Sequence, residues 1–190
     1  MARKTDIEGR AIEAALALAT EQGWEKTSYA DIAAKAGLKI AELYPIFSSK
    51  TAILAAFSRR IDEKVLAGTD PEDAEEPAHD RLLDVLLRRF EALRPQREAI
   101  AAIVKDLPRD PVTAACLARQ ATTSMRWMLR AAGLDDHGLK GMVRVRALAG
   151  IYALSLRVWL NDDSPDLGKT TASLDKNLSR LEGWTGGIGR

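Results

Sequence analysis

Few residues in this chain have types and spacing that suit enzymatic chemistry or metal binding. The single cysteine is Cys116, and the two histidines, His79 and His137, lie far apart in the sequence. One cysteine and two histidines cannot build a usual zinc site, and a lone cysteine, which we expect to be a buried and inert thiol, cannot form an internal disulfide. His79 and Asp80 could form half of a catalytic pair, but no nucleophile with an activating neighbour completes it. The sequence therefore predicts neither an enzyme nor a bound metal or cofactor.

Residues 27–54 have the pattern of two short helices joined by a tight turn. Thr27 or Ser28 can cap the first helix, with Asp31 in its first turn. Gly37 lies in the turn, where glycine allows a positive φ and lets the second helix cross the first. The residues that can form the small core at this crossing are Ile32, Ala33, Leu38, Leu43 and Phe47. The second helix, about residues 39–46, can then enter a DNA major groove while the starts of its neighbours meet phosphates.

This stretch resembles the N-terminal domain of TetR-family regulators over about residues 7–57. The matching residues are Thr27, Ile32, Ala33, Ala36, Gly37, Leu38, Leu43, Tyr44, Phe47, Ser49, Lys50 and Ile53. The resemblance implies that Thr27 caps a helix and touches phosphate, and that Lys39 and Ile40 face base edges or backbone. It also implies phosphate contacts for the Tyr44 hydroxyl and for Lys50 at a helix N-terminus. The predicted DNA-binding residues are Thr27, Ser28, Lys39, Ile40, Glu42, Tyr44 and Lys50.

Three residues depart from the family pattern. Glu42 replaces a threonine or serine and brings a negative charge near DNA, where it could accept a hydrogen bond from cytosine N4 or repel the phosphates. Pro45 removes one backbone hydrogen bond late in the short helix. Ile46 replaces a polar or aromatic residue. These changes leave the predicted fold intact but weaken the expectation of conventional operator binding.

Apolar spacing of three and four predicts nine helices and no strands. Besides a helix on each side of 39–46, the expected ranges are about 5–22, 80–93, 97–107, 111–132, 139–160 and 165–181. The predicted fold class is all-α and TetR-like. We expect a three-helix helix-turn-helix domain at 1–50, a helical ligand-binding and dimerisation domain at 51–182, and a flexible tail at 183–190. A stretch with two prolines and no large apolar side chain, 68–78, has the composition of a linker.

Charge and hydropathy limit the origin of a DNA-binding surface and the cellular location of the protein. The formal net charge is +1, so a DNA-binding surface must come from local arrangement. The N-terminal residues lack the apolar stretch of a signal peptide, and no run approaches the roughly 20 apolar residues that span a bilayer. We therefore expect a cytoplasmic protein with no membrane span.

The helix expected at 139–160 is apolar on more than one face. One stripe comprises Leu148, Ile151, Ser155 and Val158, and another comprises Val145, Tyr152, Leu156 and Trp159. One stripe can cover the protein's own core, while the other suits a partner helix. TetR-like proteins dimerise through their last two helices, so the resemblance implies a homodimer through helices eight and nine.

The C-terminal part, about residues 97–181, resembles the ubiquinone-biosynthesis lipid-binding proteins that share the TetR fold. The resemblance lies in the run DSPDLGKTTASLDKNL and in the residues around Trp127. It implies a small apolar or lipid-like effector in a cavity bounded by helices five to eight. The candidate pocket residues are Leu86, Phe90, Trp127, Met128, Leu148 and Tyr152. Ordinary core packing is the alternative for each of them.

Two functions follow from these patterns. The first is a ligand-responsive dimeric transcriptional regulator, a repressor, that binds a near-palindromic operator in double-stranded DNA. The alternative is a TetR-fold lipid- or isoprenoid-binding accessory protein related to ubiquinone biosynthesis, with weak or lost DNA binding.

Overall fold

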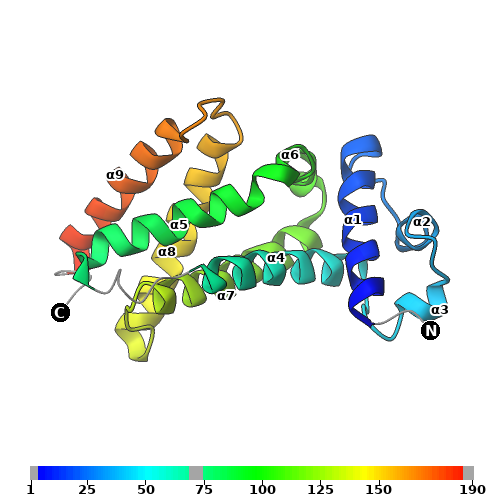
Figure 1. Ribbon diagram of the computed structural model, residues 1–190, viewed down its shortest axis with the longest axis horizontal. Helices are drawn as coiled ribbons and strands as arrows, with labels where there is room; N and C mark the ends of the chain where they lie inside the picture. Colours follow the sequence, from blue (N-terminus) through cyan, green and yellow to red (C-terminus); the bar gives the residue numbers. More distant parts are fainter. Residues whose placement is uncertain (1–3, 69–74, 186–190) are drawn as a thin grey trace. The chain divides into compact units, whose positions relative to one another are not determined.

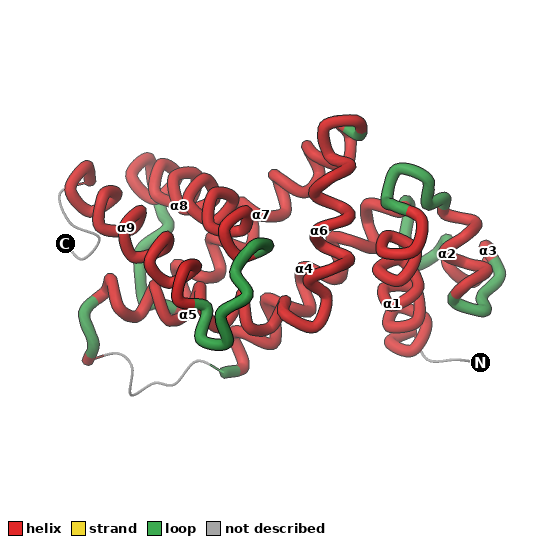
Figure 2. The backbone as a smooth tube through the Cα atoms, turned by 90° about the horizontal axis from the view of Figure 1, so that it is seen from above, coloured by secondary structure: helices red, strands yellow, loops and turns green. Residues whose placement is uncertain are grey.

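A computed structural model of the chain describes residues 4–68 and 75–185. Over these residues the secondary structure is helical and contains no strand, which confirms the predicted fold class (Figures 1 and 2). The helices are α1 (Lys4–Gln22), α2 (Tyr29–Lys35), α3 (Ile40–Leu43), α4 (Lys50–Ala67), α5 (Ala78–Leu93), α6 (Arg97–Asp106), α7 (Pro111–Ala131), α8 (Gly138–Trp159) and α9 (Gly168–Thr185). Short 3-10 turns at Arg94–Gln96 and Leu107–Arg109 flank α6.

The chain divides into two compact units. Unit 1 comprises residues 1–60 and 95–120, and unit 2 comprises residues 61–94 and 121–190. Unit 1 is thus larger than the helix-turn-helix domain predicted for residues 1–50, because α1 packs against α6 as well as against α2 and α3. The predicted linker falls largely on residues outside the described ranges. The predicted tail also does so from residue 186 onward, whereas residues 183–185 belong to α9.

The core of unit 1 forms around a helix face made mainly of alanine. Ala11, Ala15 and Ala19 of α1 are fully buried. They recur every four residues, so they share one face of the helix, and their small side chains let neighbouring helices approach closely. Larger buried residues complete the core: Trp24, Ile32, Leu43, Phe47, Ile53, Leu54 and Ile103.

Unit 2 has a core rich in aromatic side chains. Within it α9 packs against α5 and α8 (Figure 1). Phe90 of α5 stacks on Tyr152 of α8 at 5.1 Å between ring centroids, and it lies 5.6 Å from the ring of Trp159. These rings, together with buried Leu82, Leu86, Met128 and Leu148, anchor α5, α7 and α8 to a common interior.

Both apolar stripes predicted for α8 are mostly buried, so neither is the face that α8 exposes. Leu148, Ile151 and Ser155 of the first stripe are buried, as are Val145, Tyr152 and Trp159 of the second. The exposed apolar side chains of α8 lie on a third face and are Leu139, Met142, Val143 and Leu154. Because α8 is apolar nearly all round, its periodicity did not indicate which face would remain uncovered.

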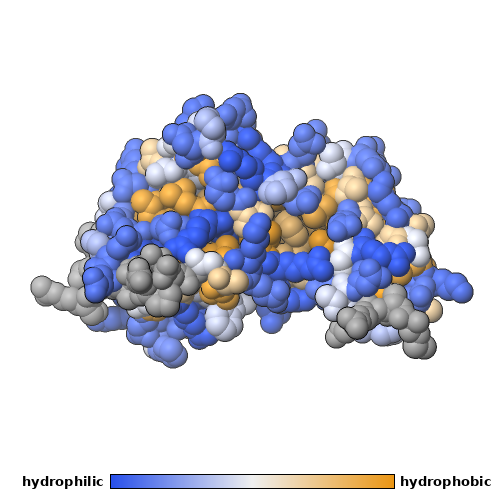
Figure 3. All heavy atoms as spheres, viewed as in Figure 1, coloured by the Kyte–Doolittle hydropathy of each residue, from blue (hydrophilic) through white to orange (hydrophobic). Residues whose placement is uncertain are grey.

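Most of the surface seen in Figure 3 is hydrophilic, with hydrophobic residues reaching it in several places. Cys116, which we expected to be buried, is exposed on α7. None of the described helices is long and apolar enough to cross a membrane.

Candidate nucleic-acid interface

Helix α2 begins with a reciprocal cap. The Ser28 hydroxyl accepts a hydrogen bond from the Asp31 backbone N–H at 3.1 Å, and the Asp31 carboxylate accepts one from the Ser28 backbone N–H at 2.9 Å. The Ser28 hydroxyl and the Ser28 backbone N–H, both beside the Asp31 carboxylate, hold the pKa of Asp31 below its ordinary value. Of the two predicted candidates, Ser28 is therefore the cap.

Thr27 has a different role from the one its resemblance implied. Its side chain is buried, and its hydroxyl donates to the Gly23 carbonyl at 2.8 Å. This contact closes the turn between α1 and α2, where Gly23 has a φ of +86°. In this structure the Thr27 hydroxyl faces the interior.

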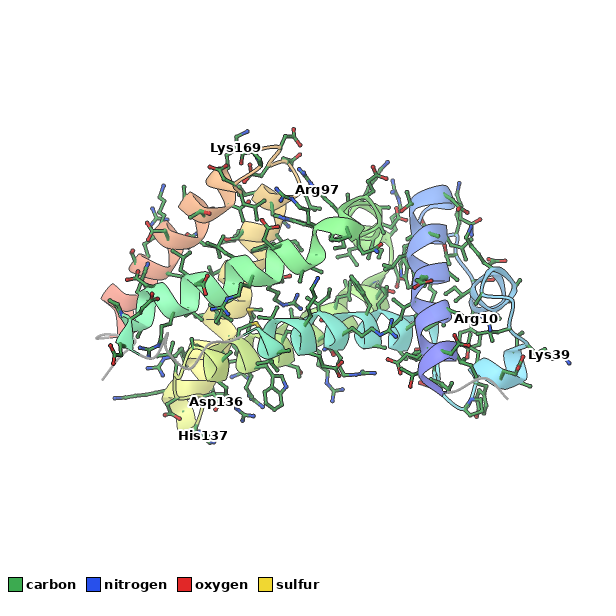
Figure 4. All side chains as sticks on the ribbon, in the orientation of Figure 1. Arg10, Lys39, Arg97, Asp136, His137 and Lys169 are labelled. Atoms are coloured by element: carbon green, nitrogen blue, oxygen red, sulfur yellow. The ribbon has the colours of Figure 1, made fainter. Side chains whose placement is uncertain are left out.

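The turn between α2 and α3 is held from α1. Gly37 adopts the positive φ, +63°, that the sequence predicted. Arg10 donates to the Ala36 and Gly37 carbonyls, the second at 3.0 Å (Figure 4). A guanidinium at the last carbonyls of α2 satisfies acceptors that the helix leaves unpaired. Sequence reasoning missed Arg10, although it directly precedes the buried alanine face of α1.

Glu42 stabilises the N-terminus of α3 by a capping contact. Its carboxylate accepts a hydrogen bond from the Lys39 backbone N–H at 2.8 Å, which is the contact that an acid at the third helical position makes with the N-cap residue. Lysine has no acceptor group, so the Lys39 side chain makes no cap hydrogen bond itself. This capping contact explains why a glutamate occupies the position where the family pattern has threonine or serine.

Helix α3 is shorter than the predicted range 39–46. It ends at Leu43, because Pro45 has no N–H with which to continue the helical ladder. The Ile46 and Phe47 backbone N–H groups instead both bond to the Leu43 carbonyl at 3.0 Å. Ile46 packs partly buried against the core, which explains why an apolar residue occupies this position.

The outward side of α3 carries large exposed side chains. Ile40 is 53% exposed and Tyr44 is 71% exposed, and Lys39 and Glu42 are exposed as well. Leu43, fully buried, fixes the opposite side of the helix in the core. Lys39, Ile40, Glu42 and Tyr44 are thus all exposed around α3, and their contacts with DNA stay a prediction.

Lys50 is tied to the turn between α1 and α2. Its Nζ donates to the Trp24 and Thr27 carbonyls, each at 3.0 Å, and lies 4.8 Å from the centroid of the Trp24 ring. Ser49 caps α4 beside it by accepting from the Ala52 backbone N–H at 3.1 Å. The Lys50 ammonium therefore joins α4 to the turn between α1 and α2, and its phosphate contact stays a prediction.

Two contacts attach the same turn to α6 and to the start of α7. The Trp24 indole N–H donates to the Thr113 hydroxyl at 3.1 Å, and the Glu25 backbone N–H donates to Asp106 at 3.1 Å. Thr113 in turn donates to Asp110 at 2.6 Å. The first two pairs are more than 80 residues apart in sequence, which is why no local pattern could indicate them.

Five of the six candidate pocket residues lie in the interior of unit 2. Leu86, Phe90, Met128, Leu148 and Tyr152 are buried. The sixth, Trp127, is 43% exposed and lies under the Arg130 guanidinium at 4.9 Å. Trp127 therefore stands apart from the buried aromatic cluster.

A buried ion pair adjoins that cluster. Arg89 Nη2 lies 3.1 Å from Asp62 Oδ1, and Ser124 bridges the pair by accepting from Arg89 at 3.2 Å and donating to Asp62 at 2.7 Å. The Arg89 guanidinium also lies over the Tyr152 ring at 5.1 Å. Burial raises the pKa of Asp62, while Arg89 and Ser124 oppose that rise. The sequence signal was an arginine within the apolar stripe Leu82, Val85, Leu86 and Leu93.

Among the described residues, one cluster could offer ligand atoms to a cation. The side-chain ligand atoms of Asp135, Asp136 and His137 lie within 4.8 Å of one another at the turn before α8 (Figure 4). The Asp136 carboxylate, however, accepts two hydrogen bonds from Arg130, at 2.9 and 3.1 Å, and lies 3.4 Å from Arg126. These guanidinium groups lower the pKa of Asp136 and already balance its charge.

Known proteins resemble this chain in the sequence of the helix-turn-helix and in the fold. Residues 11–57 match the family of bacterial regulatory proteins, tetR family. The fold is similar to a TetR transcriptional regulator from Nitrosomonas europaea (TM-score 0.70, 20% identity, 93% of this chain and 98% of that chain). It is also similar to a TetR transcriptional regulator from Rhodococcus sp. RHA1 (TM-score 0.65, 21% identity, 93% and 96% of the two chains). A third similar structure is the multidrug binding protein EbrR complexed with imidazole (TM-score 0.57, 20% identity, 91% and 88%). No curated protein sequence matches the chain.

Proposed function

We propose that the chain is a TetR-family regulator that acts in the cytoplasm as a non-enzymatic, dimeric repressor and binds a near-palindromic operator in double-stranded DNA. The observation that carries this proposal is the exposed side of α3. Ile40 and Tyr44 project from a helix braced by Glu42 and from a turn braced by Arg10. A rigid frame that leaves large apolar side chains in solvent indicates a surface made for a partner.

The dimer would form through α8 and α9. The exposed face of α8 carries Leu139, Met142, Val143 and Leu154 at helical spacing. Exposed Gly150 and Ala153 lie between them and would let a partner helix approach closely. A two-fold contact on this face would carry two helix-turn-helix motifs, which meet successive major grooves when they are about 34–36 Å apart.

The effector would be a small apolar or lipid-like molecule held in unit 2. We assign the apolar contacts of this effector to the buried rings of Phe90 and Tyr152, with Leu86, Met128 and Leu148, and its polar contact to the adjoining Arg89–Asp62 pair. The similarity to EbrR, a multidrug binding protein, supports a ligand-binding role for this part of the fold. An effector that binds the non-DNA conformation more tightly would shift the population and release the operator.

The alternative is a lipid- or isoprenoid-binding accessory protein on the same fold. The aromatic interior of unit 2 favours it. Glu42 does not favour it, because its carboxylate has a capping role within α3. The two functions differ in one respect that can be measured, which is specific binding to DNA.

The test measures, by fluorescence anisotropy, how tightly the full chain binds the promoter region of its own gene at two salt concentrations. We expect specific binding at low salt, with an affinity that falls as salt rises because phosphate contacts release counterions. Tyr44→Phe removes only the hydroxyl of an exposed side chain and should weaken binding to specific and unrelated DNA alike. If the promoter fragment binds no better than unrelated DNA of the same length at low salt, the repressor proposal fails and the lipid-binding alternative replaces it.

A further inference from the structure

The surface that α3 presents is mostly hydrocarbon. Ile40 and Tyr44 are more than half exposed, and Ala41 and Pro45 are exposed beside them. Ile40 is the first residue of the helix, and its β-branched side chain has few rotamers in a helix. Its methyl groups therefore occupy a defined place on this surface.

The polar groups of the same segment are largely committed to structure. The Glu42 carboxylate accepts from the Lys39 backbone at 2.8 Å, and Leu43 is buried. Pro45 has no backbone N–H to donate. Along residues 39–45, the remaining polar side-chain ends are the Lys39 ammonium and the Tyr44 hydroxyl.

The chemistry of base edges then limits what this surface can recognise. Guanine is usually read by two hydrogen bonds from arginine or lysine, adenine by two from asparagine or glutamine, and cytosine by an acidic acceptor. Residues 39–45 contain no arginine, asparagine or glutamine, and Glu42, their one acid, accepts the Lys39 backbone N–H. Lys39 is the one residue here of a type that reads guanine; it precedes the apolar pair, and we assign its ammonium to the DNA backbone. Thymine differs from the other bases by a C5-methyl group in the major groove, and apolar side chains read that group by contact.

We propose that Ile40 and Ala41 recognise thymine C5-methyl groups, so that each half-site of the operator is specified at α3 by A·T base pairs. This inference rests on the proposed function and names the chemistry by which the same surface selects its DNA. Lys39 and Tyr44 lie on either side of the two apolar residues in sequence and supply contacts to the backbone. Specificity then comes from shape and methyl contact rather than from a hydrogen-bonding pair.

The test removes the methyl groups from the DNA and nothing else. The full chain first selects its preferred sites from a random pool of double-stranded DNA. Each thymine of the selected half-site is then replaced in turn by deoxyuridine, which keeps every hydrogen-bonding group and lacks only the C5-methyl. Burial of one methyl group predicts a loss of roughly fourfold in affinity at each contacted position. Deoxyuridine outside the half-sites should have no effect.

Two protein variants link the effect to Ile40. Ile40→Ala should reduce the ratio of thymine to deoxyuridine affinity toward one. Val112→Ala is the matched control, because Val112 is also an exposed β-branched residue of unit 1, 68% exposed, but lies on α7. The control should retain the full ratio measured for the wild type.

The outcomes separate the two proposals. If selection yields no preferred sequence, both the repressor function and this inference are overturned. If a sequence is selected but deoxyuridine at every thymine of its half-sites leaves the affinity unchanged, this inference is overturned while the repressor function stands. Half-sites composed of G·C pairs alone would likewise overturn the inference and leave the repressor function standing.

Discussion

At the scale of single residues, the structure separates side chains that hold the DNA-reading frame from those that it leaves outward. Thr27 and Lys50 matched a family pattern for phosphate contact, yet both are engaged in the turn between α1 and α2. Ile40 and Tyr44 were predicted to face DNA and are exposed. A motif indicates which residue types recur, but it does not show that the Thr27 hydroxyl and the Lys50 ammonium have backbone carbonyls within hydrogen-bond distance.

Lys50→Ala tests the bracing role directly. Loss of two hydrogen bonds from a charged donor should lower the free energy of unfolding by about 1–3 kcal/mol in the absence of DNA. Thermal unfolding followed by circular dichroism measures this change. Lys26→Ala is the control, because Lys26 is exposed at the same turn and should change stability by less than about 0.5 kcal/mol. Equal stabilities for Lys50→Ala and the wild type would contradict the bracing role of Lys50.

Glu42 makes a capping contact and, in the proposed function, carries a charge near DNA; two variants separate these effects. Glu42→Gln keeps an acceptor for the Lys39 N–H and removes the charge, so it should raise DNA affinity on the order of two- to fivefold at low salt without changing stability. Glu42→Ala removes the cap as well and should lower stability by about 1 kcal/mol. Anisotropy at two salt concentrations and thermal unfolding give both quantities. An affinity for Glu42→Gln equal to that of the wild type would place the carboxylate away from the phosphates.

Asp162 makes stability dependent on pH in the loop between α8 and α9. Burial alone would raise its pKa, but hydrogen bonds from the backbone and hydroxyl groups of Ser164 and Thr170 outweigh burial and hold the pKa well below its usual range. A carboxyl with a depressed folded-state pKa contributes stability above its unfolded pKa, near 4, and that stability is lost as the pH falls below it.

Asp162→Asn should therefore lower the free energy of unfolding by about 1–3 kcal/mol at pH 7, and the difference from the wild type should shrink as the pH falls below about 4. Denaturant titrations at several pH values measure it. Asp80→Asn, at an exposed carboxyl of the same unit, is the control. A deficit in Asp162→Asn that stays constant down to about pH 3 would contradict the assigned role of the charge.

At the scale of elements, helix existence and most helix ends were predictable because their signals are local. Ser28 with Asp31 starts α2, and Gly37 ends the turn that follows. Pro45 was recognised as a disruption, but α3 closed two residues before it. A proline also removes the donor for the turn that precedes it, so its effect extends backward along the chain.

Side-chain partners between elements were not predictable in the same way. Arg89 lies in the apolar stripe of α5, a signal that we did not use to predict a buried charge. Its partners, Asp62 and Ser124, come from segments 27 and 35 residues away. The sequence holds no signal for which acid and which hydroxyl would meet, because that depends on how α5 packs.

At the scale of the whole molecule, the division into units follows contacts between distant segments. Residues 95–120 belong with the N-terminal residues because Trp24 bonds to Thr113 and Glu25 bonds to Asp106. The boundary predicted at residue 50 followed the end of the helix-turn-helix motif, and the stretch with the composition of a linker lies at 68–78. The helix-turn-helix was identifiable from its motif, whereas the helices that support it were not.

The last prediction concerns assembly, and it relies on the difference between exposed and buried positions of α8. Leu154 is 55% exposed on the face proposed for dimerisation, whereas Trp159 is 1% exposed and lies 5.6 Å from the Phe90 ring. Leu154→Glu should weaken the dimer by at least about 30-fold in Kd, as a charge at an interface hot spot does, while the helical content stays unchanged. Trp159→Glu should instead unfold unit 2, because it buries a charge in an aromatic core. Sedimentation at micromolar concentration and circular dichroism distinguish these results. A Leu154→Glu protein that remains a dimer with wild-type affinity would exclude this face of α8 from the interface.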